Sequence, residues 1–216
     1  MIIQLCSEAA AVSPDAEAIA PATDQDTAST DAEPSSAGRL PAAVEVAASQ
    51  ELTDGKGTCK ALFSARFDGG QVEQQFRRVK KLLEAANYDV LMVEASGGDD
   101  FGVMTALALD QVRRARGVVL AICTETYGEV TSSPYSSHEE LKFADAHRLD
   151  VIPLKVDAKF PPEPPFGSQH PFDKLGVGQA FVNKVLKPNV ARIDCCGQPD
   201  STIAALIAKA LQKRRR

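Results

Sequence analysis

The chain has 216 residues, 44% of them hydrophobic, which is enough to bury one good core. No apolar run approaches the roughly 18 residues that a membrane-spanning helix needs, and the five cysteines show neither metal-ligand spacing nor a paired framework. These features exclude a membrane span, a structural zinc site and a disulfide scaffold, and reduced thiols predict a cytoplasmic protein.

The net charge of −5 is unevenly distributed. Residues 1–57 hold ten acidic and two basic residues, a net −8, so the rest of the chain carries +3. A charge of +3 suits an anionic ligand but is too small to indicate nucleic acid. Residues 7–57 are rich in Ala, Ser, Thr, Pro, Asp and Glu and contain no aromatic residue. Such a segment cannot offset its ordering entropy, which predicts a disordered acidic leader over 1–57 and one domain over 58–216.

Within the domain, apolar strand-like runs alternate with amphipathic helical segments. Strands are predicted over 59–64, 89–95, 117–123, 150–156 and 190–194. Helices are predicted over 71–88, 103–115, 138–149 and 202–214, the last capped by Ser201, while 160–178 is Pro- and Gly-rich and irregular. This alternation predicts an α/β fold with a five-stranded parallel sheet covered on both faces.

Ligands of such folds gather at the carboxyl ends of the strands. The loops after Ser64, Val93 and Cys123 are therefore the places to look for a site. Three histidines have no cysteine partners at metal spacing, and the chain contains neither a Walker motif nor a G-x-S-x-G motif. No metal site is predicted.

Four strings in order carry a family resemblance: ALFSAR (61–66), VEASGGDDFG (93–102), ARGVVLAICTETY (115–127) and SSHEELKFADAHRLDVIPL (136–154). Together they resemble the boxes of a TIR (Toll/interleukin-1 receptor) domain over about 150 residues. Tyr127 and the Glu140-Leu141 pair keep their places in the boxes. The departures are Ala65 where Tyr is common, Thr124 for Ser, and Ser136 where the family has Trp.

The resemblance implies a flavodoxin-like three-layer sandwich with a five-stranded parallel sheet. It also implies one of two functions in signalling. Some TIR domains cleave NAD between nicotinamide and ribose with one glutamate, which here corresponds to Glu140. Others are non-catalytic modules that self-associate or bind other TIR domains. NAD would be a substrate, and no cofactor is expected.

One carboxylate suffices for this reaction. The leaving group is a cationic pyridinium that departs as neutral nicotinamide, so no general acid is needed, unlike ordinary glycoside hydrolysis. A carboxylate near the ribose can stabilise an oxocarbenium-like transition state. Water as acceptor would give ADP-ribose, and an internal nucleophile would give a cyclic product.

Glu139 competes with Glu140 for the catalytic role. If Tyr135 replaces the missing aromatic at Ser136, the Y-x-x-x-E spacing selects Glu139 instead. Both glutamates flank the apolar stripe of Leu141 and Ala144, so helical phase leaves the choice open. A glutamate near a helix start also suits the helix dipole without any catalytic role.

Six other residues are candidates for binding substrate, each with a plain structural alternative. Arg66 would contact the NAD phosphates or form a surface ion pair. Ser64 would hydrogen-bond the ligand or end a strand. Phe101 and Met104 would stack on nicotinamide, with core packing as the alternative for Met104. Glu94 would contact a ribose hydroxyl or remain a solvated loop carboxylate.

The sixth candidate is Tyr135, in the aromatic role described above. Two alternatives to NAD cleavage stay open. A TIR interaction module would assemble through the Gly-rich loop at 96–102, where Asp99 and Asp100 supply charge. A nucleoside 2-deoxyribosyltransferase-like enzyme would share the architecture and a catalytic glutamate.

Overall fold

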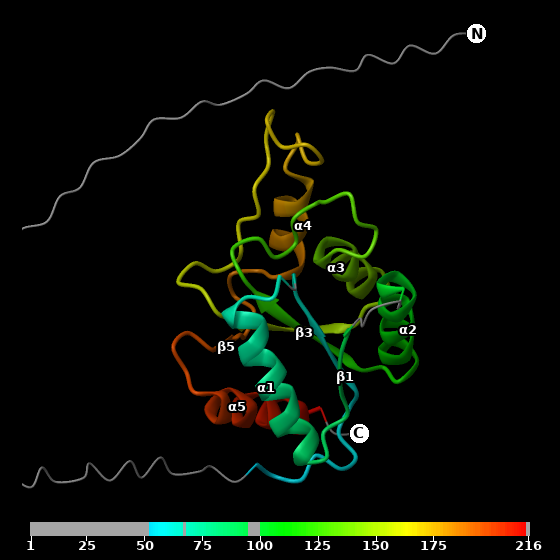
Figure 1. The fold of residues 1–216 in the computed structure, drawn as a ribbon, viewed down its shortest axis with the longest axis vertical. Coiled ribbons are helices and arrows are strands. Elements are labelled where there is room, and N and C mark those ends of the chain that lie inside the picture. The colour runs from blue at the N-terminus through cyan, green and yellow to red at the C-terminus, as the bar shows by residue number, and fades with distance from the viewer. Residues whose placement is uncertain (1–51, 67, 95–99, 215–216) are drawn as a thin grey trace, which may run out of the picture. The chain divides into compact units, whose positions relative to one another are not determined.

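The computed structural model describes residues 52–66, 68–94 and 100–214 (Figure 1). The strands are β1 (Ala61–Ser64), β2 (Val90–Met92), β3 (Val118–Cys123), β4 (Asp150–Lys155) and β5 (Ile193–Asp194). The helices are α1 (Gln71–Ala85), α2 (Phe101–Arg114), α3 (Ser137–Ala146), α4 (Val177–Val185) and α5 (Asp200–Gln212).

The five strands form one sheet in the order β2-β1-β3-β4-β5, and every pair is parallel. This confirms the predicted α/β class with a five-stranded parallel sheet. The chain runs outward from β1 to β2 and then returns to β3 on the other side of β1. In open α/β sheets the crevice at such a reversal, beyond the carboxyl ends of the strands, is where ligands bind.

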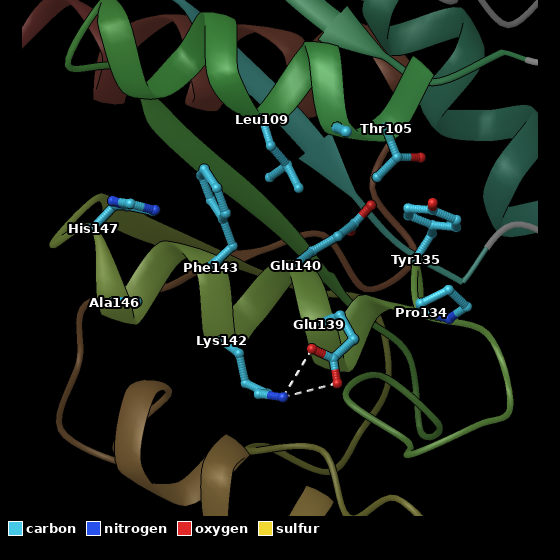
Figure 2. A pocket seen from close by; sticks show the side chains of 11 residues that line it. Thr105, Leu109, Pro134, Tyr135, Glu139, Glu140, Lys142, Phe143, Ala146 and His147 are labelled. Carbon is cyan, nitrogen blue, oxygen red and sulfur yellow. Dashed lines mark hydrogen bonds and ion pairs between the residues drawn. The ribbon is translucent and has the colours of Figure 1, made fainter. Parts of the chain in front are cut away.

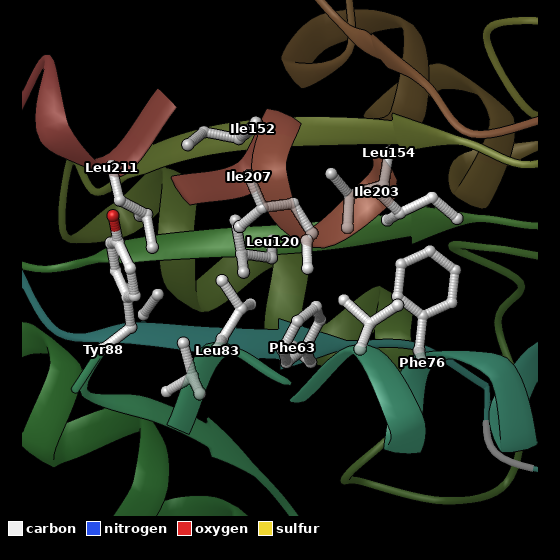
Figure 3. Close-up of a cluster of buried hydrophobic side chains, with 14 of the residues drawn as sticks. Phe63, Phe76, Leu83, Tyr88, Leu120, Ile152, Leu154, Ile203, Ile207 and Leu211 are labelled. Carbon is white, nitrogen blue, oxygen red and sulfur yellow. The ribbon is translucent and has the colours of Figure 1, made fainter. Parts of the chain in front are cut away.

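Helices α1 and α5 cover one face of the sheet, and Figure 3 shows the core between them. Alternate residues of the strands point to this face because strand side chains have a period of two. The large side chains that are almost fully buried in this cluster include Phe63, Phe76, Leu83, Leu120, Leu154, Ile203, Ile207 and Leu211. Full burial of each such side chain contributes about 1.5–3 kcal/mol.

Helices α2, α3 and α4 pack on the opposite face. Leu62 of β1 contacts the cluster that includes Leu109 and Val112 of α2. Ala121 of β3 belongs to a second cluster with residues of α3 and α4, including Leu141. Buried residues of β1 and β3, the two strands that flank the reversal, belong to these clusters.

Two sequence predictions are corrected here. The predicted irregular segment ends at Gly176, and α4 follows it as a helix that was not predicted. Its first turn is held by Asp173, whose carboxylate accepts backbone N–H groups of Gly176, Val177 and Gly178 at 2.8–2.9 Å. Ser201 does not cap the last helix, because α5 already begins at Asp200 with Pro199 in the capping position.

The predicted leader lies outside the described residues except for its last six, 52–57. Of these, Leu52 packs against the core of α1 and α5, and Thr53 hydrogen-bonds the hydroxyl of Tyr88 at 3.1 Å. The backbone of Gly55 donates to Ala86 at 2.7 Å. No helix within the described ranges is long and apolar enough to cross a membrane.

Candidate functional site

Three polar side chains meet beneath the surface at the carboxyl ends of β1 and β3. Ser64 is the last residue of β1, Tyr127 follows β3, and Glu140 lies in the first turn of α3. The Ser64 hydroxyl lies 2.5 Å from Glu140 Oε2 and 2.9 Å from the Tyr127 hydroxyl. Ser64 and Tyr127 are fully buried, and Glu140 is 4% exposed. The sequence separates these residues by 63 and 76 positions, and the fold brings them into one hydrogen-bonded chain.

Burial controls the ionisation of this cluster. Loss of solvation raises the pKa of Glu140 from 4.5 to about 8, although the hydrogen bond from Ser64 opposes the shift. Burial also raises the pKa of Tyr127 well above its ordinary value, so its phenol keeps its proton. In this environment Glu140 is therefore mostly neutral at pH 7.

Glu140 lines a cavity of about 420 Å³ between α2 and α3 (Figure 2). The remaining walls are largely apolar and include Leu109, Phe143 and the ring of Tyr135. In Figure 2 the Glu140 side chain reaches from α3 toward α2, with Tyr135 and Thr105 beside it. The cavity thus combines one titratable carboxyl group with apolar surface of the kind that accepts an aromatic ring.

Glu139 has a different environment, although it also lines the cavity. Its carboxylate pairs with Lys142 at 2.8 Å on the outer side of α3, and both side chains are more than one third exposed (Figure 2). The geometry separates the two glutamates that helical phase left equivalent: Glu140 points into the protein and Glu139 points to solvent.

A second cavity of about 300 Å³ adjoins the first and is more polar. Arg66 and Phe101 line it, together with hydroxyl-bearing residues of the 131–137 segment. Arg66 is half-exposed and forms an ion pair with Glu129, and the second oxygen of Glu129 lies 3.3 Å from Nε2 of His170. Sequence reasoning missed Glu129 and His170, and nothing in their local sequence connects positions 66, 129 and 170.

Tyr135 belongs to the walls of both cavities. Its ring lies on Gly102 at the start of α2, where a Cβ atom would collide with it. Asp100 caps this helix by accepting the backbone N–H groups of Gly102 and Val103 at 2.9 and 3.1 Å. A glycine at position 102 is thus what allows an aromatic ring to separate the two cavities.

Two predicted site residues lie outside both cavities. Glu94 is half-exposed and pairs with Arg77 at 3.2 Å and Lys80 at 3.6 Å. Met104 packs against the α2 cluster that includes Leu62 and Leu109. The structural alternatives for these two residues, a surface carboxylate and a core methionine, match their positions.

The predicted residues Ser64, Arg66, Phe101, Tyr135 and Glu140 do come together at this edge of the sheet. Residues 95–99, which include Asp99 and the first part of the Gly-rich loop, lie outside the described residues. Over the described ranges, no group of three or more His, Cys, Asp or Glu side chains could hold a metal ion. In comparisons with known proteins, no family model matches this chain and no curated protein matches it significantly.

Proposed function

We propose that this chain is a TIR-type enzyme that cleaves NAD between nicotinamide and ribose, with Glu140 as the catalytic carboxylate. The observation that carries the proposal is the placement of Glu140. It is a single buried carboxyl group, fixed by Ser64, on the wall of a largely apolar cavity beside the sheet reversal. The sequence resemblance selects the same residue independently of this geometry.

The reaction needs little from the protein besides this arrangement. The bond between the ribose anomeric carbon and the pyridinium nitrogen breaks, and its electron pair stays with nicotinamide, which leaves neutral. Positive charge develops on the ribose, where an ionised Glu140 stabilises it. Water then adds to the anomeric carbon and loses a proton, which gives ADP-ribose, while an internal nucleophile would give a cyclic product.

The raised pKa of Glu140 fits a cationic substrate. In the free protein at pH 7 the group is mostly neutral, because its pKa of about 8 lies above the solution pH. A pyridinium cation in the cavity favours the carboxylate, since an opposite charge within a few ångströms lowers the pKa of an acid. Binding of NAD should therefore release a proton from Glu140.

Arg66 is the group that suits the diphosphate of NAD. It lies in the polar cavity on the other side of Tyr135, and a guanidinium matches phosphate oxygens in charge and geometry. Its present partner is Glu129. A diphosphate would have to share Arg66 with this carboxylate or displace it.

The test is incubation of the purified protein with NAD, at high concentration and with a crowding agent, followed by chromatography of the products. Wild-type protein should release nicotinamide, and Glu140→Gln should not. Glu139→Gln is the matched control, because it removes the neighbouring acid that pairs with Lys142 at the surface. Undiminished turnover in Glu140→Gln would refute the proposal, and base transfer between deoxyribonucleosides would indicate the deoxyribosyltransferase alternative.

A second candidate, a TIR assembly module, is favoured by the outer surface of α2. Val103 and Leu107 are one helical turn apart and 51% and 57% exposed. These neighbouring apolar side chains are the part of α2 through which a contact with a second domain would form. A charged substitution at Leu107 should reduce self-association in analytical ultracentrifugation, and an unchanged monomer fraction would count against the module.

A further inference from the structure

The buried hydrogen-bonded chain continues beyond Ser64 to Tyr127, a residue that the reaction above does not use. Tyr127 and Ser64 are both 0% exposed, so neither hydroxyl can exchange its partner for bulk water. The only hydrogen-bond partners of these two hydroxyl groups among the described residues are each other and the carboxyl group of Glu140. Because these three hydrogen-bonded groups are closed to solvent, the direction of each hydrogen bond between them can be worked out from the number of protons available.

An ionised Glu140 permits only one arrangement. The carboxylate has no proton, so the short contact to Oε2 requires Ser64 as donor. Ser64 has a single hydroxyl proton, so the 2.9 Å contact to Tyr127 requires the phenol as donor. The chain therefore runs from Tyr127 to Ser64 to Glu140, and every buried donor in it has an acceptor.

A neutral Glu140 with its proton on Oε2 reverses this chain. The acid then donates to Ser64, and Ser64 donates to Tyr127. The phenolic proton of Tyr127 is left without an acceptor among the described residues. A buried donor without a partner carries a penalty of about 1–3 kcal/mol, so Tyr127 disfavours this arrangement.

We infer that Tyr127 is a positioning residue that acts through Ser64: it orients the serine proton toward Oε2, which favours the carboxylate and makes Oε1 the oxygen that takes the proton when Glu140 is neutral. The inference rests on the proposed catalytic role of Glu140. In this orientation Oε2 is held by Ser64, while Oε1 has no hydrogen-bond partner among the described residues. One oxygen is thus anchored and the other remains free for the ligand in the adjoining cavity.

The measurement is the titration of Glu140 itself. Protein labelled with ¹³C at the glutamate carboxyl carbon gives one signal per glutamate in NMR spectra, and the signal missing in Glu140→Gln identifies this residue. Tyr127→Phe should raise the pKa of Glu140 and so lower its ionised fraction at pH 7 by about twofold or more, because the neutral acid can then take its proton on either oxygen and the bond from Ser64 to the carboxylate loses the phenol that strengthens it. The pH profile of NAD cleavage should move in the same direction and by the same amount.

Tyr88→Phe is the matched control. Tyr88 is also buried, and its hydroxyl is hydrogen-bonded to Thr53 and Gln212 rather than to the site. Its substitution removes an equivalent phenolic hydroxyl and should leave the Glu140 titration unchanged. A Glu140 titration that is identical in wild type and Tyr127→Phe would overturn the inference.

Ser64→Ala tests whether Tyr127 acts on Glu140 through Ser64. It should raise the pKa of Glu140 more than Tyr127→Phe does, because it removes the direct donor. Adding Tyr127→Phe to this variant should then have no further effect, and a full additional shift would overturn action through Ser64. If Tyr127→Phe does not fold, Ser64→Ala alone is the test. An unchanged titration of Glu140 in Ser64→Ala would contradict the hydrogen-bonded chain.

The titration does not depend on turnover. A shift in Tyr127→Phe together with no NAD cleavage by wild type would refute the proposed function and leave the positioning role supported. Cleavage of NAD by wild type with no pKa shift in Tyr127→Phe would support the proposed function and overturn the positioning role.

Discussion

Replacing Glu140 by glutamine removes an ionisable group from an enclosed position and keeps an oxygen that can accept the hydrogen bond of Ser64. We expect this variant to be more stable than the wild type at neutral pH. The pKa of Glu140 is 4.5 in the unfolded chain and about 8 in the folded protein, so folding favours the neutral acid. The contribution of the neutral Glu140 to stability is fully present below pH 4.5 and is lost as the pH rises toward 8.

The size of the stability difference between Glu140→Gln and the wild type follows from the interval between these two pKa values. Each pH unit between the two pKa values lowers the stability of the wild type by about 1.4 kcal/mol, whereas the amide of the variant does not titrate. The difference should be negligible at pH 4.5, about 3 kcal/mol at pH 7 and about 5 kcal/mol above pH 8. With a urea m-value of about 2 kcal/mol per molar, the midpoint at pH 7 should rise by about 1.5 M.

Urea unfolding of both proteins at several pH values between 5 and 8 measures this difference. Glu139→Gln is the control, because an exposed ion pair contributes about 0–1 kcal/mol and its loss should show no such pH trend. A gap between wild type and Glu140→Gln that stays constant from pH 5 to pH 8 would refute the reasoning. So would a wild type that is the more stable protein at pH 8.

Three further outcomes are expected. The kcat/KM for NAD should rise with pH up to about 8 and then level, because the proposed reaction needs Glu140 ionised in the free protein, and a flat profile between pH 6 and 8 would contradict this. Asp173→Ala should lower the free energy of unfolding by about 2 kcal/mol in urea titrations, because three backbone N–H groups at the start of α4 lose their acceptor. An unchanged midpoint would show that water replaces the carboxylate. Gly102→Ala should displace the Tyr135 ring and raise KM for NAD about two- to tenfold. Adding Tyr135→Ala should raise KM no further, and an additive increase would show that the two residues act independently.

The sheet could be predicted from sequence because its strands are short apolar runs separated by helices with clear periodicity. Helix α4 could not, for a local reason. It has nine residues, follows a Pro- and Gly-rich segment, and is preceded by Gly176, whose backbone is left-handed. Its capping side chain, Asp173, stands several residues upstream and reaches the helix only through the fold of the intervening turn.

The choice between Glu139 and Glu140 needed the packing of α3 as well as its sequence. Both residues border the apolar stripe of Leu141 and Ala144, so the pattern alone is symmetrical. Helix α3 begins above the carboxyl ends of β1 and β3, and this position turns residue 140 toward Ser64. The contact between Ser64 and Glu140, which are 76 positions apart, depends on the order of the strands in the sheet, and no local sequence pattern predicts that order.

The enclosure of Glu140 also has an evolutionary consequence. A glutamate codon becomes a glutamine codon by a single nucleotide change, and here that change would remove the acid while leaving the surface of the domain intact. If selection for turnover were relaxed in a descendant, this mutation would be favoured for its stability, because most other random substitutions weaken a fold. If the proposed function is right, lineages of this domain should therefore drift readily from enzymes to inactive scaffolds, and glutamine at this position would identify those that have done so.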